Sequence, residues 1–342
     1  MRAVVPTLCV AALTAGCGGC GGEYDWNLRS ETDVFAQAPN NQVDILWVVD
    51  DSYSMAEEQA TLAAGFASFG DELEISGTDF HIGVITTSFE YTNPLRGALQ
   101  GDPPFLTAAD DYEVEFQERA TAVGVEGSDK EKGLEAASWA VSPAMTAPNG
   151  VNAGFVRSTA QLLIVVVSDE EDCSDNGALE GQSPEACYTE SDQLIPVIDV
   201  IEDLQDLKDD PSRATISAIV GQADSPCPEV WHGSRYIAAA SNTGGFTGDI
   251  CESNWNGMLA TMGLHAVGIR DSFKLDDGAQ ADTITVDVDG ASVVQSDTDG
   301  WTYDPRTWYV TFHGASVPPR DAVITISYVV DPGNVAPVTT GT

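Results

Sequence analysis

Asp50, Ser52 and Ser54 place one carboxylate and two hydroxyl groups at alternate positions of a short polar segment, Asp-x-Ser-x-Ser. Oxygen atoms of this kind are ligands for hard divalent cations, and Mg²⁺ keeps several of its waters when a protein binds it. A second acidic segment, residues 169–172, follows Ser168. The chemistry that these residue types predict is cation binding.

The residues before these two segments predict how the segments are positioned. Residues 43–49 and 161–167 are apolar runs rich in β-branched side chains, the pattern of strands buried on both faces of a parallel sheet. Each run ends at one of the acidic segments, and ligand sites of open α/β sheets lie at the carboxyl ends of strands. Strand and helix patterns alternate up to about residue 265, so the predicted fold is α/β with a doubly wound, mostly parallel sheet.

The Asp-x-Ser-x-Ser segment after a buried strand resembles the opening motif of von Willebrand factor A (vWA) domains. The segments SDEEDCS and GS-x₄-GLEA resemble vWA lipoproteins of Gram-negative bacteria. The resemblance implies a Rossmann-like vWA fold with a metal-ion-dependent adhesion site (MIDAS), in which a hydroxyl from a second loop and an Asp after the central strand complete the ligand set. Asp169 matches that Asp. Ser128, five residues before Gly133, matches the hydroxyl, where Thr is commoner, and Asp129 is a neighbouring alternative.

By this resemblance the ion is Mg²⁺, with Mn²⁺ or Ca²⁺ as alternatives, and five residues hold it directly or through water: Asp50, Ser52, Ser54, Ser128 and Asp169. An ion held mainly by neutral hydroxyls stays electrophilic, so a carboxylate from a protein ligand can complete its shell. Four further acids exceed what such a site needs: Asp51, Glu170, Glu171 and Asp172. They are either solvated loop charges or ligands of a second cation.

Composition divides the rest of the chain. Residues 18–42 are Gly-rich and then polar without a sustained period, and short alternating apolar runs after about residue 265 are separated by Asp-Gly, Asp-Pro and Pro-Pro, which is typical of antiparallel β structure. The predicted parts are a lipoprotein signal peptide (1–16), a flexible tether (17–41), a vWA domain with the metal site (42–265), a small β domain (266–331) and a disordered tail (332–342).

The first residues are typical of an export signal, because Arg2 is followed by an apolar stretch too short to span a membrane. Residues 13–17 resemble the cleavage site of bacterial lipoproteins, in which Cys17 becomes the lipidated first residue. By the same resemblance, Gly18 favours the outer membrane. Ordinary secretion is the alternative, and we predict no transmembrane helix further along the chain.

Export also predicts disulfide bonds. Short-range closure is the simplest connectivity, and it pairs Cys173 with Cys187 and Cys227 with Cys251, which leaves Cys20 as the odd thiol. Zinc binding is the alternative, but Cys-x₂-Cys spacing occurs only at Cys17 and Cys20.

Fifty-four acidic residues against 14 basic ones give a formal charge of −40. Nucleic acid and bare anionic membranes are therefore excluded as partners, since both require basic residues, and membrane contact is expected only through a lipid anchor. The predicted function is a surface-anchored protein that binds a protein or matrix ligand through its metal.

Two alternatives remain: a structural envelope protein with a stabilising metal, and a metal-dependent hydrolase or phosphotransferase with Asp50 as nucleophile. Haloacid-dehalogenase-like enzymes use Asp-x-Asp where this chain has Ser52, and no His, Lys or Cys stands nearby as a base or nucleophile. We therefore predict that the chain is not an enzyme.

Overall fold

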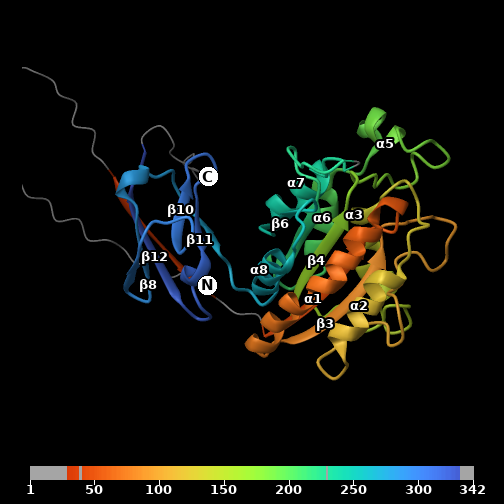
Figure 1. The fold of residues 1–342 in the computed structure, drawn as a ribbon, viewed down its shortest axis with the longest axis horizontal. Coiled ribbons are helices and arrows are strands. Elements are labelled where there is room, and N and C mark those ends of the chain that lie inside the picture. The colour runs from red at the N-terminus through yellow and green to blue at the C-terminus, as the bar shows by residue number, and fades with distance from the viewer. Residues whose placement is uncertain (1–28, 38–40, 229, 332–342) are drawn as a thin grey trace, which may run out of the picture.

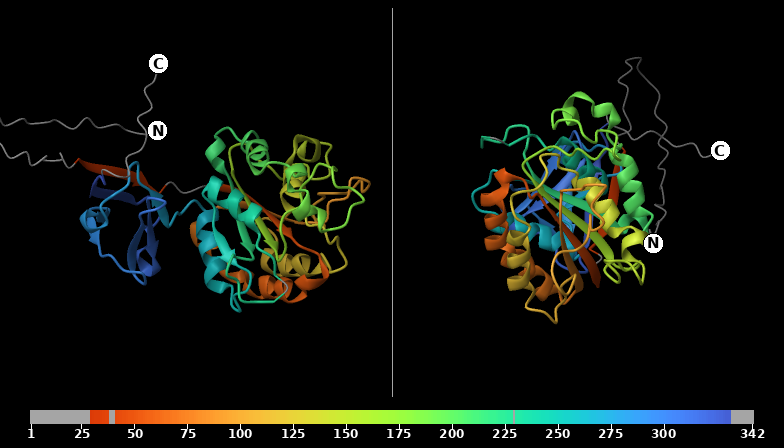
Figure 2. Two further views of the ribbon diagram at one scale, coloured as in Figure 1. Left: turned by 90° about the horizontal axis from the view of Figure 1, so that it is seen from above. Right: turned by 90° about the vertical axis from the view of Figure 1, so that its right-hand side faces the viewer.

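The computed structural model describes residues 29–37, 41–228 and 230–331, which form an α/β unit and a smaller β unit side by side (Figures 1 and 2). The predicted signal peptide, the lipidation site Cys17, the odd thiol Cys20 and the C-terminal tail lie outside the described residues.

A five-stranded parallel sheet forms the centre of the α/β unit, with the strand order β3-β2-β4-β5-β6. The strands are β2 (Gln42–Val49), β3 (Asp79–Thr86), β4 (Gln161–Ser168), β5 (Ala214–Val220) and β6 (Thr247–Asp249). The chain therefore winds outward in one direction from β2 and in the other from β4. This reversal creates a topological switch point between β2 and β4, the place where open α/β sheets bind ligands.

Helices cover both faces of this sheet (Figure 1). One face packs against α1 (Ala56–Ser76), α2 (Tyr112–Ala122) and α8 (Asn256–Ala266), and the other against α3 (Gly133–Val141), α6 (Val197–Gln205) and α7 (Ser234–Thr243). Two short helices lie in connections, α4 (Pro143–Thr146) and α5 (Ala186–Thr189). The 3₁₀ turns are η1 (Tyr53–Met55), η2 (Ser191–Gln193), η3 (Pro211–Arg213), η4 (Ala281–Thr283) and η5 (Gly314–Ser316).

Burial on both faces explains the apolar run in β2. Ile45 and Trp47 belong to the core beneath α1, whereas Leu46 belongs to the core beneath α3. Trp47 packs edge-on against Phe69 and Phe116, with ring centroids 5.3 and 5.2 Å away. The prediction of a mixed α/β fold built on a parallel sheet is confirmed at this level.

The β unit consists of two antiparallel sheets that share one apolar core. Their orders are β1-β12-β8-β9 and β10-β11-β7. The strands are β1 (Ser30–Ala36), β7 (Ser272–Lys274), β8 (Thr285–Val288), β9 (Ala291–Val293), β10 (Gly300–Asp304), β11 (Tyr309–His313) and β12 (Val323–Val329).

The flexible tether predicted for residues 17–41 is wrong over β1. That strand pairs with β12 along its whole length, from Ser30 opposite Val329 to Ala36 opposite Val323. It lies at the edge of its sheet and has only Phe35 packed against the core, so the segment carries little of the apolar alternation that marks a strand. The β unit is therefore completed by a strand that precedes the α/β unit in the sequence.

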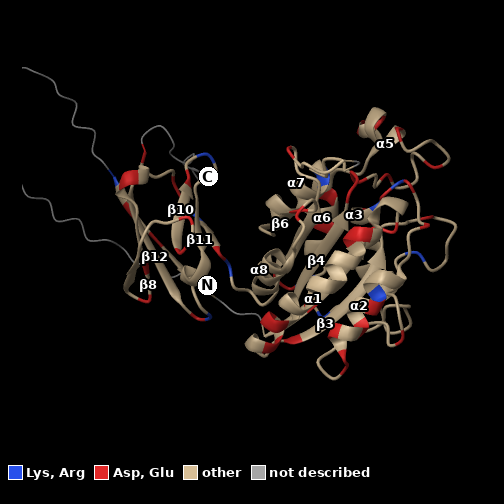
Figure 3. Ribbon diagram, in the orientation of Figure 1, with Lys and Arg blue, Asp and Glu red and all other residues tan. Residues whose placement is uncertain are grey.

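Hydrogen bonds join the two units at the end of α1 and at residue 270, between α8 and β7. The Gln37 side chain donates to the carbonyl oxygens of Arg270 (2.6 Å) and Pro318 (3.0 Å), and Arg320 donates to the carbonyl of Ser76 (2.6 Å). Acidic residues greatly outnumber basic ones across both units (Figure 3). Among the described residues, every helix is too short or too polar to cross a membrane.

Both predicted disulfides are present. Cys173 is bonded to Cys187 and Cys227 to Cys251, with Cα–Cα distances of 5.2 and 5.6 Å. The first bond closes the loop after β4 onto α5, and the second joins the segment after β5 to the residues after β6.

Replacing both Cys173 and Cys187 with alanine is expected to lower the free energy of unfolding by roughly 2–4 kcal/mol, because the reduced chain regains the freedom of a 14-residue loop. Guanidinium unfolding under non-reducing conditions measures the change. The parent protein unfolded with a reductant is the matched control and should lose at least as much stability, since both bonds then open. A double variant as stable as the parent would contradict the expectation.

Candidate metal centre

The two acidic segments meet at the switch point of the sheet. Asp50 follows β2, and Asp169 follows β4, the strand hydrogen-bonded beside it. The backbone N–H of Asp50 donates to the carbonyl of Val167 at 2.9 Å, which continues the strand pairing as far as the site. Both carboxyl groups come from residues that are at most 3% exposed. Their position agrees with the sequence-based expectation.

The Asp-x-Ser-x-Ser segment folds tightly around Asp50. Its Oδ1 accepts a hydrogen bond from the backbone N–H of Ser52 at 2.8 Å, and its Oδ2 accepts from the hydroxyl of Ser168 at 2.6 Å. The hydroxyls of Ser52 and Ser54 lie 3.1 Å apart. Ser52 is buried and Ser54 is exposed, so the segment leads from the buried Asp50 carboxylate to the surface.

A second loop packs directly against the first. The N–H of Gly127 donates to the carbonyl of Asp51 at 2.7 Å, and Ser88 donates to Oδ1 of Asp51 at 2.8 Å. A Cβ atom at position 127 would stand 2.3 Å from the same Oδ1. Glycine is therefore required for this approach. Gln59 of α1 joins both loops by donating to the carbonyls of Asp50 (2.9 Å) and Gly124 (2.8 Å).

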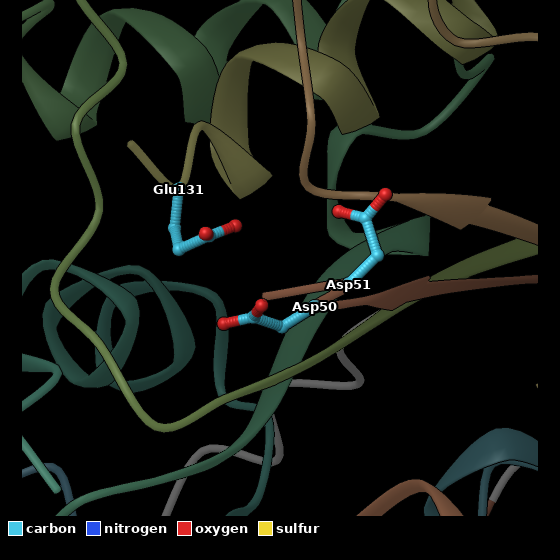
Figure 4. A group of neighbouring side chains, drawn as sticks. All are labelled: Asp50, Asp51 and Glu131. Carbon is cyan, nitrogen blue, oxygen red and sulfur yellow. The ribbon is translucent and has the colours of Figure 1, made fainter. Parts of the chain in front are cut away.

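Glu131 completes the group, and sequence reasoning did not identify it. Oxygen atoms of Asp50, Asp51 and Glu131 all lie within 4.8 Å of one another, and no other His, Cys, Asp or Glu cluster in the described ranges meets this criterion. Figure 4 shows the three carboxylates around a common space, two from the end of β2 and one from the segment before α3. Glu131 is 1% exposed. The Thr87 hydroxyl donates to Oε2, but the buried Oε1 has no hydrogen-bond partner among the described residues.

Burial raises the pKa of three acids at this site, Asp50, Glu131 and Glu170. It raises the pKa of Asp50 to about 7, against the hydrogen bonds from Ser168 and Ser52, and the negative charge of Asp169 adds to the rise. Burial, and after it the charge of Asp50, raises the pKa of Glu131 well above its ordinary value. Burial and the neighbouring Asp169 and Asp129 raise the pKa of Glu170 to about 7. Such crowding is relieved either by protons or by a cation.

The hydroxyl and the backbone N–H of Ser128 both form hydrogen bonds with neighbouring residues. Its hydroxyl accepts from the N–H of Lys130 at 3.0 Å, and its own N–H donates to Ser88 at 2.8 Å. These contacts link it to the group through Ser88 and Asp51, whereas Glu131 belongs to the group itself. Asp129 is exposed, and its charge acts on Glu170. The assignment of a metal ligand to Ser128 or Asp129 stays a prediction.

The acids proposed for a second cation have different surroundings. Asp172 forms an ion pair with Arg235 at 2.9 Å and accepts from the N–H of Leu134 in the first turn of α3 at 3.1 Å. Glu171 accepts from the N–H of Arg235 in the first turn of α7 at 3.0 Å. Both therefore stabilise helix N-termini, while Asp51 belongs to the group with Asp50. The four acids are not gathered at one point.

The oxygen atoms suit a hard divalent cation. Asp50, Asp51 and Glu131 supply carboxylates, Ser52 and Ser54 supply hydroxyls, and the buried Oε1 of Glu131 is an acceptor without a donor among the described residues. A cation in this space would satisfy that oxygen and reduce the repulsion among the carboxylates. Glu131 lies in the GS-x₄-GLEA segment, two residues before the glycine that begins α3, so its place in the second loop could be found from the sequence. No local pattern shows that its side chain is buried.

No family model matches this chain, and no curated protein matches it. Among solved structures, the chain is similar to the pilus adhesin SpaC from Lactobacillus rhamnosus GG in its open conformation, with 14% identity, a TM-score of 0.38 and coverage of 90% of this chain and 43% of the adhesin. Another form of SpaC gives 13% identity, a TM-score of 0.38 and coverage of 90% and 45%. Proximal thread matrix protein 1 from the mussel byssus gives 14% identity, a TM-score of 0.35 and coverage of 72% and 52%. The chain thus spans less than half of the adhesin and about half of the mussel protein.

Proposed function

We propose that this chain binds a divalent cation, Mg²⁺ in the first place and Mn²⁺ or Ca²⁺ as alternatives, at the group of Asp50, Asp51 and Glu131, with Ser52, Ser54 and Asp169 beside it. The observation that carries the proposal is the Oε1 atom of Glu131, which is buried without a hydrogen-bond partner in the described structure and faces two aspartates from another loop. Membership in the vWA family belongs to the same proposal. It is supported by the Asp-x-Ser-x-Ser segment after β2 and by Asp169 after β4, on adjacent strands of a parallel sheet.

The bound ion would serve to hold a protein ligand at the surface of the cell envelope. Ser54 and Tyr53 are exposed at the edge of the site, with Tyr53 86% exposed, so a partner can approach the ion from this side. A ligand that offers a carboxylate would then complete the shell of the ion. The anchor is Cys17, which lies outside the described residues, and lipid mass on the mature N-terminal peptide is its test. Two disulfides agree with an oxidising, exported location.

Calorimetric titration of Mg²⁺ and Mn²⁺ tests the ion site. We expect one saturable site in the parent protein and at least a tenfold loss of affinity in Asp169→Ala, because the variant removes a carboxylate beside the cation. Asp203→Ala, which removes an exposed aspartate of α6, is the matched control for diffuse binding to this acidic surface and is expected to behave as the parent. Equal affinity in parent, Asp169→Ala and Asp203→Ala would contradict the site.

Water-proton relaxation of bound Mn²⁺ separates ligand binding from a purely structural metal. An ion that keeps exchangeable waters enhances relaxation, and added acetate should lower the enhancement as a carboxylate displaces water. Enhancement that is unchanged by acetate would instead favour the structural envelope protein with a stabilising metal. The prediction that the chain is not an enzyme stays a prediction.

A further inference from the structure

Two aromatic side chains lie exposed beside the metal centre. Tyr188 is 44% exposed and Trp231 is 57% exposed. Their ring centroids are 5.4 Å apart, and the ring planes are tilted by 39°. They therefore form one continuous aromatic surface rather than two scattered residues. Large exposed aromatic surfaces of this kind are typical of binding sites.

Both rings are attached to parts of the chain that disulfides hold in place. Tyr188 belongs to α5 and directly follows Cys187, whose bond to Cys173 ties α5 to the loop after β4. Trp231 lies between β5 and α7, in the segment that the second disulfide closes, and its N–H donates to the carbonyl of Asp169 at 2.7 Å. A surface fixed in this way loses little conformational entropy when a ligand binds.

The surroundings of the rings are negative. Burial, and after it the charge of Glu170, raises the pKa of Tyr188 to about 12 against a backbone hydrogen bond at Glu171, and the charges of Glu171 and Asp169 add to the rise. The charges that act on Tyr188 are thus those of carboxylates, while Arg235 is a cation beside them and the exposed His232 follows Trp231 in the chain. That arginine is paired with Asp172 at 2.9 Å and also donates to the carbonyl of Ile195 at 2.6 Å.

A hollow of about 260 Å³ adjoins the ring of Tyr188 and offers room beside it. Its lining includes Glu171, Tyr188, Leu194 and Ser234, together with Arg235, whose charge is already paired with Asp172. An apolar stem could lie along Leu194 and the tyrosine ring while a charged head meets the Glu171 carboxylate. Lysine and arginine are the side chains with such a stem and a positive head.

We propose that Tyr188 and Trp231 form a subsite for a lysine or arginine side chain of the protein ligand, next to the metal centre. Aromatic faces attract cations, and the neighbouring carboxylates strengthen the attraction. An anionic group would be repelled at this place, and a neutral sugar would make no use of the charge. The inference deepens the proposed function, because it supplies a second contact for a ligand whose carboxylate binds the ion.

The test uses an eight-residue peptide of glycine and serine that carries three arginines and a fluorescent label, titrated into the mature chain with EDTA present. Fluorescence anisotropy should show binding to the parent protein and much weaker binding of the same peptide with glutamates in place of the arginines. Trp231→Leu and Tyr188→Leu keep apolar side chains but remove the aromatic faces. Each is expected to weaken binding about threefold, and the double variant about tenfold.

Ile75→Ala is the matched control, since Ile75 is 80% exposed at the C-terminal end of α1, the opposite end of that helix from the site. It should bind the arginine peptide as the parent does. Parent-like affinity in Trp231→Leu would overturn the subsite, as would failure of the arginine peptide to bind the parent. Binding of a neutral chitin or cellulose oligosaccharide that depends on Trp231, in place of the arginine peptide, would overturn it in favour of a carbohydrate site.

Metal binding is measured separately in the same variants. Trp231→Leu is expected to bind Mg²⁺ as the parent does, because neither ring belongs to the carboxylate group. If the parent itself binds no Mg²⁺ while the arginine peptide still depends on Trp231, the proposed function fails and the aromatic subsite stands. Loss of Mg²⁺ binding in Trp231→Leu would instead show that the tryptophan acts by shaping the loop of Asp169.

Discussion

Replacing Glu131 with glutamine is expected to weaken Mn²⁺ and Mg²⁺ binding at least tenfold while leaving the metal-free protein as stable as the parent or more stable. Glutamine keeps the shape of the side chain and an oxygen that can accept from the Thr87 hydroxyl. It removes one of three carboxylates whose oxygens lie within 4.8 Å of one another, and repulsion among them falls. The same change removes attraction for the cation, and even indirect partners of a metal cost roughly 10- to 100-fold in affinity when lost.

Titration calorimetry and thermal unfolding, each with metal and with chelator, measure the two effects of Glu131→Gln. The metal should raise the unfolding temperature of the parent more than that of the variant, since a ligand that binds only the folded state stabilises it by mass action. Glu135→Gln is a matched control: it alters another buried acid four residues further on, which accepts from Tyr91 and from the N–H of Asp175. That variant is expected to keep the metal affinity of the parent.

Ser128→Ala separates Ser128 from Glu131 as the second-loop ligand. If Glu131 faces the ion, the alanine variant binds metal nearly as the parent does, because the Ser128 hydroxyl is engaged with Lys130. Unchanged affinity in Glu131→Gln combined with a large loss in Ser128→Ala would place the ligand at Ser128, as the resemblance to vWA domains implies.

The strands of the parallel sheet could be predicted from the sequence because burial on both faces requires a continuous run of apolar residues. The runs at 43–49 and 161–167 coincide within one residue with β2 and β4. The two disulfides could be predicted for a similar reason, since each joins cysteines close in sequence. Where an element is stabilised by its own neighbours in the chain, its residue types are enough.

Contacts between distant segments produce no local sequence pattern of this kind. β1 carries a mostly polar sequence, and it is a strand because β12, nearly 300 residues later, offers it an edge. Glu131 is buried because the loop that carries it packs against Asp51 and Thr87, whereas a glutamate between two lysines is usually solvated. The resemblance implies a hydroxyl from this loop, which stays a prediction, whereas the structure adds the carboxylate of Glu131 to the group.

The role of Asp44, at the other end of β2, could not be predicted either. This acid interrupts the apolar run, and nothing nearby in the sequence indicates its partners. Its side chain is 0% exposed. Oδ2 accepts from the N–H of Arg157 at 2.6 Å, Oδ1 accepts from Nε of Arg157 at 2.7 Å, and Nζ of the buried Lys208 lies 3.6 Å from Oδ2. Burial lowers the pKa of Lys208, and the charge of Asp44 opposes this fall. One buried carboxylate thus faces two cations at the amino end of the sheet, of which Arg157 is also paired with Asp79 at 2.8 Å.

Asp44→Ala is therefore expected to lower the free energy of unfolding by roughly 3–5 kcal/mol, since it removes the carboxylate that faces the buried ammonium group of Lys208. Asp44→Asn should cost less, because an amide oxygen can still accept from the N–H of Arg157. Denaturant unfolding followed by circular dichroism measures both.

Asp304→Ala is the control, since it removes the partner of an 88% exposed arginine and is expected to leave stability unchanged within error. Mg²⁺ affinity should be the same in all three variants, because Asp44 and Asp50 lie six residues apart along an extended strand, about 20 Å. An Asp44→Ala protein as stable as the parent would contradict this account of the buried Lys208 charge.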